Sequence, residues 1–312
     1  MTVPATPHVD AAAAARARRQ RAWLLLGLLA LVWGSHWTVV KIGLEDIPPF
    51  SYGVLRVVLG AATMAGLLGM RHQLRPPARA DLPIVLSYGL IGIAATIALM
   101  NAGLGAIGAG RASVLAYTLP LWVVPIMAVV RRSRPTRAEW LGLGLGMAGL
   151  ALLMEPSTID WAAPGALVGA CLLLMDAFAG ALAGVHVRLH RWSGTLLEAQ
   201  PWQLLVALVP LSLLAIVEGG RIDWGPRAIL VLLYSGPLAT AFGYWASQSV
   251  TRTLGPLAAG VGLLSVPVVG ITVGAIVLHE PVGPAELAGL LVTGTGVAVV
   301  LLRPRKESLR TG

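Results

Sequence analysis

The chain has 312 residues, of which 56% are hydrophobic and 12% charged, and its mean hydropathy is +0.78. Soluble globular proteins carry about 25% charged residues, so this chain has too few polar groups to cover a water-exposed surface. Its net charge of +9 comes from basic residues in short segments between apolar runs. That pattern is an orientation signal of membrane proteins and excludes a nucleic-acid-binding patch.

Apolar runs of about twenty residues recur along the chain and predict an all-α polytopic membrane protein. A membrane barrel is excluded, because its strands alternate apolar and polar residues and these runs do not. Cys171 is the only cysteine and lies inside an apolar run. It therefore excludes an intramolecular disulfide and a thiolate metal cluster.

Residues 1–22 are rich in Ala, Pro and Arg and are expected to form a mobile, basic cytoplasmic tail. The apolar run that follows resembles a signal peptide, but it continues to about Gly43, so we expect no cleavage. A basic tail is also expected at residues 303–312. Ten transmembrane helices are predicted, at approximately 23–43, 50–70, 82–101, 110–130, 138–154, 164–186, 198–217, 226–248, 257–278 and 284–302.

The loop charges predict the orientation of these helices. With the N-terminus in the cytoplasm, 18 of the 23 basic residues fall in cytoplasmic segments. The positive-inside rule then places both termini in the cytoplasm and the protein in the plasma (inner) membrane.

A gapless shift of 147 residues aligns the two halves of the chain, residues 23–155 and 164–302. It pairs Pro120 with Pro267 and Asn101 with Gln248. Because five helices is an odd number, the second half must enter the membrane from the opposite side, as an inverted repeat. Inverted repeats with interrupted helices are typical of transporters that work by alternating access around a site between the halves.

Several motifs appear in order along the chain. They are Trp33-Gly34-Ser35, Lys41-Ile42-Gly43-Leu44, Val54-Leu55-Arg56, Gly236 with Thr240, Ala241, Tyr244 and Trp245, Thr253-Leu254-Gly255, Pro267 and Glu280-Pro281. Together with the repeat, this set resembles the drug/metabolite transporter superfamily, specifically its EamA type, over about residues 23–302. The resemblance implies transport of small metabolites, often export of amino acids, no enzymatic chemistry, and a cavity lined by the first, third, fourth, sixth, eighth and ninth helices.

The chain departs from the family pattern at two positions. Val266 stands where an acidic residue often precedes the proline, and His36 stands where a small or amide residue commonly follows Trp-Gly-Ser. A relative's substrate therefore cannot be transferred to this chain.

Asp176 is the strongest candidate for function, because a carboxylate in mid-membrane is costly unless it faces a cavity or a partner. It is predicted to bind a substrate ammonium group or to carry a coupling proton. The structural alternative is a protonated Asp bonded to a neighbouring helix. His36, beside Trp33, is either a cavity wall residue that titrates near neutral pH or a neutral histidine bonded within the bundle.

Pro120 and Pro267 each remove a backbone donor and are predicted to form kinks or hinges that expose carbonyl groups to substrate. The alternative is a passive kink, which membrane helices tolerate. A pocket for an amphipathic or aromatic solute is expected from six further side chains. They are Asn101, Tyr117, Trp122, Tyr244, Trp245 and Gln248. The alternative is that the Tyr and Trp side chains anchor the helices at the membrane interface.

Arg56 and Glu280 are predicted to be charges at the outer gate. Arg56 is expected to snorkel or to pair with Glu45 or Asp46, although it could instead attract a substrate carboxylate. Glu280 is expected to be a solvated cap, with gating as the alternative. Glycine-rich helices 138–154 and 284–302, the fifth and tenth, are expected to pack closely and offer a homodimer contact.

The chain has no phosphate-binding loop, zinc-binding His pair or nucleophile elbow, so neither a cofactor nor catalysis is expected, although proton coupling remains open. The leading hypothesis is a secondary transporter that exports amino acids or related amphipathic metabolites. Two other hypotheses stay open: an uptake or exchange carrier for another metabolite, and a non-transporting sensor or assembly protein.

Overall fold

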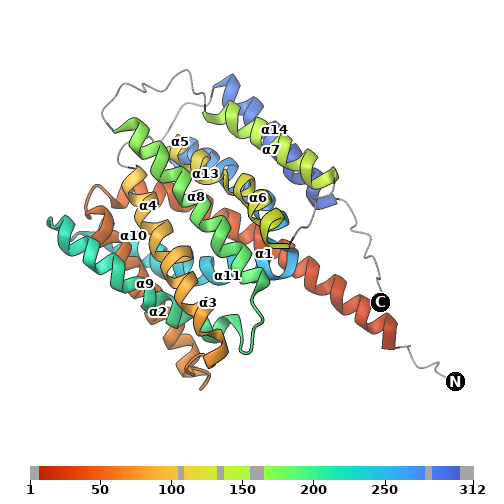
Figure 1. Cartoon of the computed structure of the whole chain (residues 1–312). Coiled ribbons are helices and arrows are strands. Elements are labelled where there is room, and N and C mark those ends of the chain that lie inside the picture. The colour runs from red at the N-terminus through yellow and green to blue at the C-terminus, as the bar shows by residue number, and fades with distance from the viewer. Residues whose placement is uncertain (1–6, 105–108, 132–136, 155–164, 278–282, 303–312) are drawn as a thin grey trace.

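The computed structural model describes residues 7–104, 109–131, 137–154, 165–277 and 283–302. These residues form helices and contain no strand (Figure 1). In chain order the helices are α1 (Pro7–Gly43), α2 (Pro49–Met70), η1 (Arg79–Asp81), α3 (Leu82–Ser87), η2 (Tyr88–Ala95), α4 (Thr96–Leu104), α5 (Ala109–Ala116), α6 (Leu119–Arg131), α7 (Arg137–Met154), α8 (Ala166–Leu189), α9 (Leu196–Glu218), α10 (Pro226–Leu233), η4 (Tyr234–Phe242), α11 (Gly243–Leu254), α12 (Pro256–Leu263), α13 (Ser265–Val277) and α14 (Pro284–Leu302).

Seven of these helices or helix runs are long and apolar enough to cross a membrane. They are Arg16–Gly43, Pro49–Met70, Arg79–Leu104, Ala166–Leu189, Leu196–Glu218, Pro226–Leu254 and Ala258–Val277. Three shorter apolar helices cover Ala112–Met127, Trp140–Leu153 and Leu287–Gly296. The composition and these helices are those of a multi-pass membrane protein.

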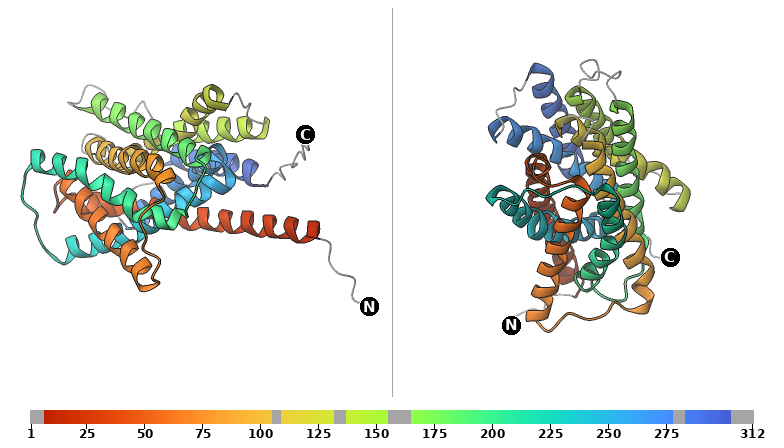
Figure 2. Two further views of the ribbon diagram at one scale, coloured as in Figure 1. Left: turned by 60° about the horizontal axis from the view of Figure 1, so that its bottom comes forward. Right: turned by 90° about the vertical axis from the view of Figure 1, so that its left-hand side faces the viewer.

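The helix α1 begins at Pro7, whereas the composition predicts a mobile tail up to residue 22. Residues 7–22 are instead helical and continue directly into the apolar part of α1. The run from Ala11 to Ala15, followed by several arginines, explains the difference, because Ala and Arg are strong helix formers. This part of α1 projects from the bundle (Figures 1 and 2).

Each proline-bearing segment is divided into two helices. The break between α5 and α6 lies at Tyr117 and Thr118, and the break between α12 and α13 lies at Leu264. At both breaks a hydroxyl group donates to the carbonyl three residues earlier. Thr118 Oγ1 bonds Leu115 O at 2.8 Å, and Ser265 Oγ bonds Gly262 O at 2.7 Å. Because these donors and acceptors are both separated by 147 residues, the two breaks are equivalent.

Pro120 and Pro267 lie in the first turn of α6 and α13, just after the breaks. A proline is well tolerated there, because first-turn N–H groups have no partner within the helix. Each proline therefore begins a new helix instead of bending a continuous one.

Two π-helical segments, η2 and η4, are also equivalent in the two halves, since residues 88–95 correspond to 235–242. Each packs on a helix of the other half. A Cβ added at Gly89 in η2 would meet Val206 of α9, and one added at Gly236 in η4 would meet Leu59 of α2. The members of these two contacts differ by 147 residues, so the halves contact one another reciprocally.

Equivalent helices of the two halves pack antiparallel. In the α2–α9 pair, the Phe50 N–H donates to the Glu218 carboxylate at 2.9 Å, so the start of α2 meets the end of α9. In the α7–α14 pair, a Cβ at Gly149 would lie 2.8 Å from Gly289 O, and one at Gly296 would lie 2.8 Å from Gly142 O. Figure 1 shows α7 and α14 side by side at one edge of the molecule. These glycines therefore allow the close helix contact within the chain that the sequence predicts.

Candidate functional site

A cavity lies between the two halves. Its walls come from α1, α2, η2, α4, α5, α6, α8, α11 and α12. These elements correspond to the six helices that the family resemblance implies, with α2 in addition. The polar and aromatic residues that line it are Trp33, His36, Trp37, Arg56, Tyr88, Thr96, Tyr117, Asp176, Tyr244, Ser247, Gln248 and Thr251.

Two opposite charges line this cavity without neutralising one another. Arg56 is 3% exposed, and its Nε–H donates to Thr240 Oγ1 at 2.9 Å, but its Nη1 has no hydrogen-bond partner. Asp176 is partly buried in the cavity wall and has no hydrogen-bond or ion-pair partner among the described residues. A buried charge is strongly destabilising unless it is paired. Both charges are therefore suited to groups of a ligand.

Tyr244 lies within electrostatic range of both Arg56 and Asp176. Its hydroxyl is 3.3 Å from Thr96 Oγ1. Its ring makes edge-to-face contacts with Trp33 and Tyr88, with ring centroids 5.8 and 6.4 Å away. Aromatic faces of this kind bind apolar or cationic groups.

His36 belongs to a polar cluster at the cavity wall. Its Nε2 is 3.2 Å from Ser235 Oγ, which in turn is 2.5 Å from the Tyr52 hydroxyl. The His36 side chain therefore has a bonded partner within the bundle and also lines the cavity. His36 therefore occupies both positions considered from the sequence, on the cavity wall and in a hydrogen bond within the bundle.

Trp33 and Tyr117 line the cavity as expected. The Trp33 Nε1–H donates to Ala239 O of η4 at 2.9 Å, which orients the indole. Tyr117 lies at the break between α5 and α6 and contacts Trp37 edge to face at 6.3 Å. The break thus presents an aromatic ring to the cavity.

Asn101 and Gln248 are equivalent in sequence, but the structure separates their roles. Gln248 lines the cavity and belongs to a buried amide cluster with Gln200 and Gln203, at 2.6 and 2.8 Å. Asn101 is fully buried, does not line the cavity, and donates to Pro49 O at 2.7 Å. Asn101 therefore does not line the pocket for which the sequence suggested it, because this bond turns its amide toward the start of α2.

Arg56 does not form the expected pair with Glu45 or Asp46. Glu45 and Asp46 pair with Arg227 of α10 instead: Arg227 Nη1 is 2.8 Å from Glu45, and its other nitrogens bond Asp46. The Arg227 guanidinium holds the pKa of Asp46 below its ordinary value. Arg56 is left inside the bundle because Thr240 of η4 packs directly against α2. Glu280 lies outside the described residues.

The two prolines affect the cavity through residues four positions earlier. Pro120 and Pro267 have no N–H, so the carbonyls of Ala116 and Leu263 cannot receive the usual helical bond. Both Ala116 and Leu263 line the cavity. The equivalent breaks therefore lie beside the site.

Tyr88, Thr96, Ser247 and Thr251 line the cavity but were not singled out from the sequence. The signal that would have found them is helical periodicity. Tyr244, Ser247 and Thr251 repeat every three or four residues and hence share one helix face. Among the described residues no cluster of three His, Cys, Asp or Glu side chains could hold a metal ion.

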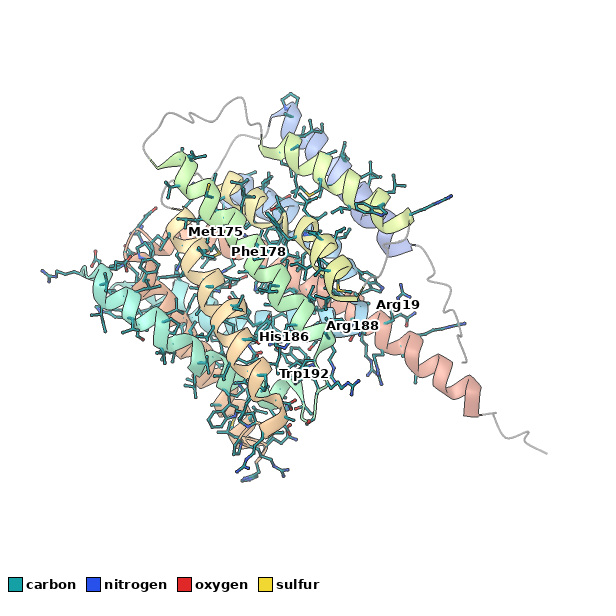
Figure 3. The ribbon with its side chains drawn as sticks, in the orientation of Figure 1. Arg19, Met175, Phe178, His186, Arg188 and Trp192 are labelled. Carbon is teal, nitrogen blue, oxygen red and sulfur yellow. The ribbon has the colours of Figure 1, made fainter. Side chains whose placement is uncertain are left out.

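The end of α8 beyond the cavity carries a second polar cluster. Figure 3 shows Met175 and Phe178 near the middle of α8, and His186, Arg188 and Trp192 toward its C-terminal end. There Asp81 accepts hydrogen bonds from His190 Nε2 at 2.8 Å and from the Gly194 N–H at 2.7 Å. This cluster fixes the loop between α8 and α9 to the start of α3.

Two segments of the chain, residues 21–155 and 167–302, each match the EamA-like transporter family. The chain belongs to this family. The EamA-like transporter is thus a multi-pass membrane protein of a family that transports solutes, as the motifs and the repeat predict.

Individual relatives agree with this assignment. "Uncharacterized transporter YoaV" of Bacillus subtilis is 25% identical over 280 residues, covering 88% of this EamA-like transporter and 95% of the relative. Two proteins named "Probable amino-acid metabolite efflux pump" are also similar. The one from Salmonella typhimurium is 27% identical over 91% of this chain and 97% of its own, and the one from Escherichia coli is 26% identical over 89% and 95%.

A solved crystal structure of a further protein has the same fold. It superposes on this EamA-like transporter with a TM-score of 0.70 at 19% sequence identity, covering 92% of this chain and 99% of that chain.

Proposed function

We propose that this EamA-like transporter carries zwitterionic metabolites of the amino-acid type through the cavity between its halves. The observation that carries the proposal is the pair of unneutralised charges in one cavity. Arg56 offers a free Nη1 for a carboxylate, and Asp176 offers a carboxylate for an ammonium group. Hydrogen bonds to charged groups contribute about 1.5–3 kcal/mol each, so a ligand with both charges gains most.

The cavity lining supports an amphipathic ligand and disfavours a highly charged one. The other walls of the cavity are mainly aromatic or apolar, and Tyr244 is among the residues that line them. A nucleotide or sugar phosphate would need several cations, whereas Arg56 is the one cation among the described residues that line this cavity. His36 completes the wall as a neutral donor or acceptor.

Export is the proposed direction of net flux. Two relatives are named as amino-acid metabolite efflux pumps, which supports export. Uptake or exchange of another metabolite remains the alternative, because the gradient sets the direction of a carrier with inverted halves. A sensor or assembly protein is the third hypothesis, and it predicts no flux.

The proposed architecture has ten transmembrane helices in two inverted repeats, with both termini in the cytoplasm of the plasma membrane. The antiparallel packing of α2 on α9 and of α7 on α14 supports inversion. The basic residues that flank the helices support the orientation. The reciprocal contacts and the equivalent breaks occur in both halves, so each half can adopt the conformation of the other. Alternating access requires such an exchange.

We propose no cofactor for the carrier. Asp176 could exchange a proton for the substrate ammonium group, because both would neutralise the same carboxylate. A homodimer, if one forms, would use surface other than Gly142, Gly149, Gly289 and Gly296, which pack within the chain.

Efflux from cells tests the proposal directly. Cells with and without the protein are loaded with dipeptides, and the amino acids that leave are measured over time, comparing Asp176→Asn with Asp223→Asn at matched expression. Asp223 is an exposed carboxylate in the segment between α9 and α10, outside the cavity. The proposal requires faster efflux that only Asp176→Asn abolishes. No efflux of any amino acid would contradict it.

A further inference from the structure

A second groove opens at the end of the bundle that the proposed orientation places in the cytoplasm. It lies where the end of α2, the start of α9 and the second half of α11 meet. None of the residues that line it also lines the central cavity. The transport mechanism proposed above therefore gives this groove no role.

Two exposed arginines line this groove. Arg75 follows the end of α2, and the Trp202 Nε1–H donates to its backbone carbonyl at 2.9 Å, which holds this segment against α9. Arg252 lies in the last turn of α11, and its guanidinium carbon is 5.4 Å from the centre of the Trp192 ring. Figure 3 shows Trp192 beyond the C-terminal end of α8. Among the described residues, neither guanidinium group has a hydrogen-bond or ion-pair partner.

The charged groups of the groove leave one positive charge over. Glu198 is the one acidic residue among the described residues that line it, and its Oε2 accepts the Thr195 N–H at 2.9 Å. Two guanidinium groups and one carboxylate together match the single negative charge of a phosphodiester. Arginine is also the side chain whose planar fork of donors fits phosphate oxygens.

The groove continues from the arginines toward the apolar part of the bundle. Trp245 lines it two turns before Arg252 on α11, about 10 Å nearer the middle of the membrane along the helix axis. Leu68 of α2 and Leu196 of α9 are 1% and 7% exposed and form its buried wall. Positive groups at the membrane surface and an apolar wall at greater depth match the polarity of a phospholipid. A soluble phosphate would contact the arginines alone.

We propose that this groove binds an anionic phospholipid of the cytoplasmic leaflet. Its phosphate lies between Arg75 and Arg252, and one acyl chain lies against Leu68 and Trp245. Basic pockets between transmembrane helices on the cytoplasmic side can hold anionic headgroups, and the negative surface of that leaflet supplies them. Arg75 belongs to the first half of the chain and Arg252 to the second, so the lipid links the two halves at this end of the protein.

Native mass spectrometry of the full-length protein in detergent tests the proposal. The protein is titrated with a phosphatidylglycerol, with a phosphatidylethanolamine that has the same acyl chains, and with inorganic phosphate. The double variant Arg75→Gln/Arg252→Gln removes both cations of the groove. The double variant Arg71→Gln/Arg191→Gln is the matched control, because it removes two exposed arginines that do not line the groove. Melting curves without lipid show whether each variant is folded.

We expect the wild type to bind phosphatidylglycerol more tightly than phosphatidylethanolamine. The affinity for phosphatidylglycerol should fall at least about tenfold in the groove variant and stay unchanged in the control. Equal losses in both variants would overturn the proposal, because they would indicate attraction to a basic surface in general. Equal affinity of the wild type for the two lipids, or binding of inorganic phosphate as tight as that of phosphatidylglycerol, would also overturn it. These wild-type comparisons decide the question even if the groove variant does not fold, and none of the outcomes depends on amino-acid transport.

Discussion

The two halves of the chain share a backbone and differ in the side chains they present to the cavity. The hydroxyl-capped breaks at Thr118 and Ser265, the π-helical segments η2 and η4, and the close contacts of Gly89 and Gly236 all recur after 147 residues. These features set how the halves fit together. They are the parts that a symmetric conformational change must keep the same on both sides.

The side chains that line the cavity, by contrast, differ between the two halves. Arg56 corresponds to Gln203, Asp176 to Leu29, and the two tryptophans of α1 to two glycines of α8. Each charge occurs in one half alone. The difference teaches that a duplicated scaffold can line its cavity asymmetrically, and in the proposed carrier a substrate would therefore bind in one orientation.

The largest effect is expected at Asp176. Asp176→Asn removes a charge that has no counterpart in the first half, and with it about 1.5–3 kcal/mol of interaction with an ammonium group. Transport should fall about 10- to 150-fold, measured as counterflow of a labelled amino acid in liposomes. A variant with wild-type flux would show that Asp176 is a structural carboxyl group, and the asymmetry would lose its main element.

Arg56→Gln gives the first half the amide that its equivalent, Gln203, already provides. Flux of zwitterions should fall at least about tenfold, because the carboxylate loses a charged donor. Flux of an amine without a carboxyl group, such as phenethylamine, should change little. If the flux of both solutes falls equally, Arg56 supports the fold through its bond to Thr240 and does not bind the substrate carboxylate.

The shared backbone predicts a smaller and equal effect at the two breaks. Thr118→Val and Ser265→Ala each remove one hydroxyl bond, which contributes about 1 kcal/mol. We expect each to slow transport about fivefold with substrate affinity retained, measured by flux and by binding to detergent-solubilised protein. Strongly unequal effects would mean that the breaks, although equivalent in position, do not move together.

The smallest effect is expected at the ion pairs that Arg227 forms with Glu45 and Asp46, because exposed ion pairs contribute little to folding stability. Arg227→Gln should lower the Tm by no more than about 2 °C near neutral pH. The pKa of Asp46 is depressed in the folded state. The ion pair of Asp46 with Arg227 therefore stabilises the fold at pH values above the ordinary pKa of Asp, and this stabilisation is lost as the pH falls through the depressed pKa. Melting curves of wild type and variant should therefore converge below about pH 4.

Much of the scaffold could be predicted from the sequence, because local chemistry determines it. The 147-residue shift, the equivalent prolines and the apolar runs all follow from residues read in order. Asp176 could be singled out from the sequence because placing a carboxylate within an apolar run costs free energy on any face of the helix.

The remaining features depend on contacts between distant segments. The π-helical segments have no simple sequence pattern, and Arg56 lies inside because Thr240, 184 residues away, accepts its hydrogen bond. Asn101 turns from the cavity because Pro49 O is within 2.7 Å.

The measurement that tests the central claim most directly is a binding cycle on the purified protein with three ligands. They are an amino acid, its methyl ester, and the acid that lacks the amino group. We predict that Asp176→Asn weakens binding of the amino acid and ester but not the acid, while Arg56→Gln weakens binding of the amino acid and acid but not the ester. Equal losses for all three ligands in both variants would contradict a single asymmetric site that reads both charges.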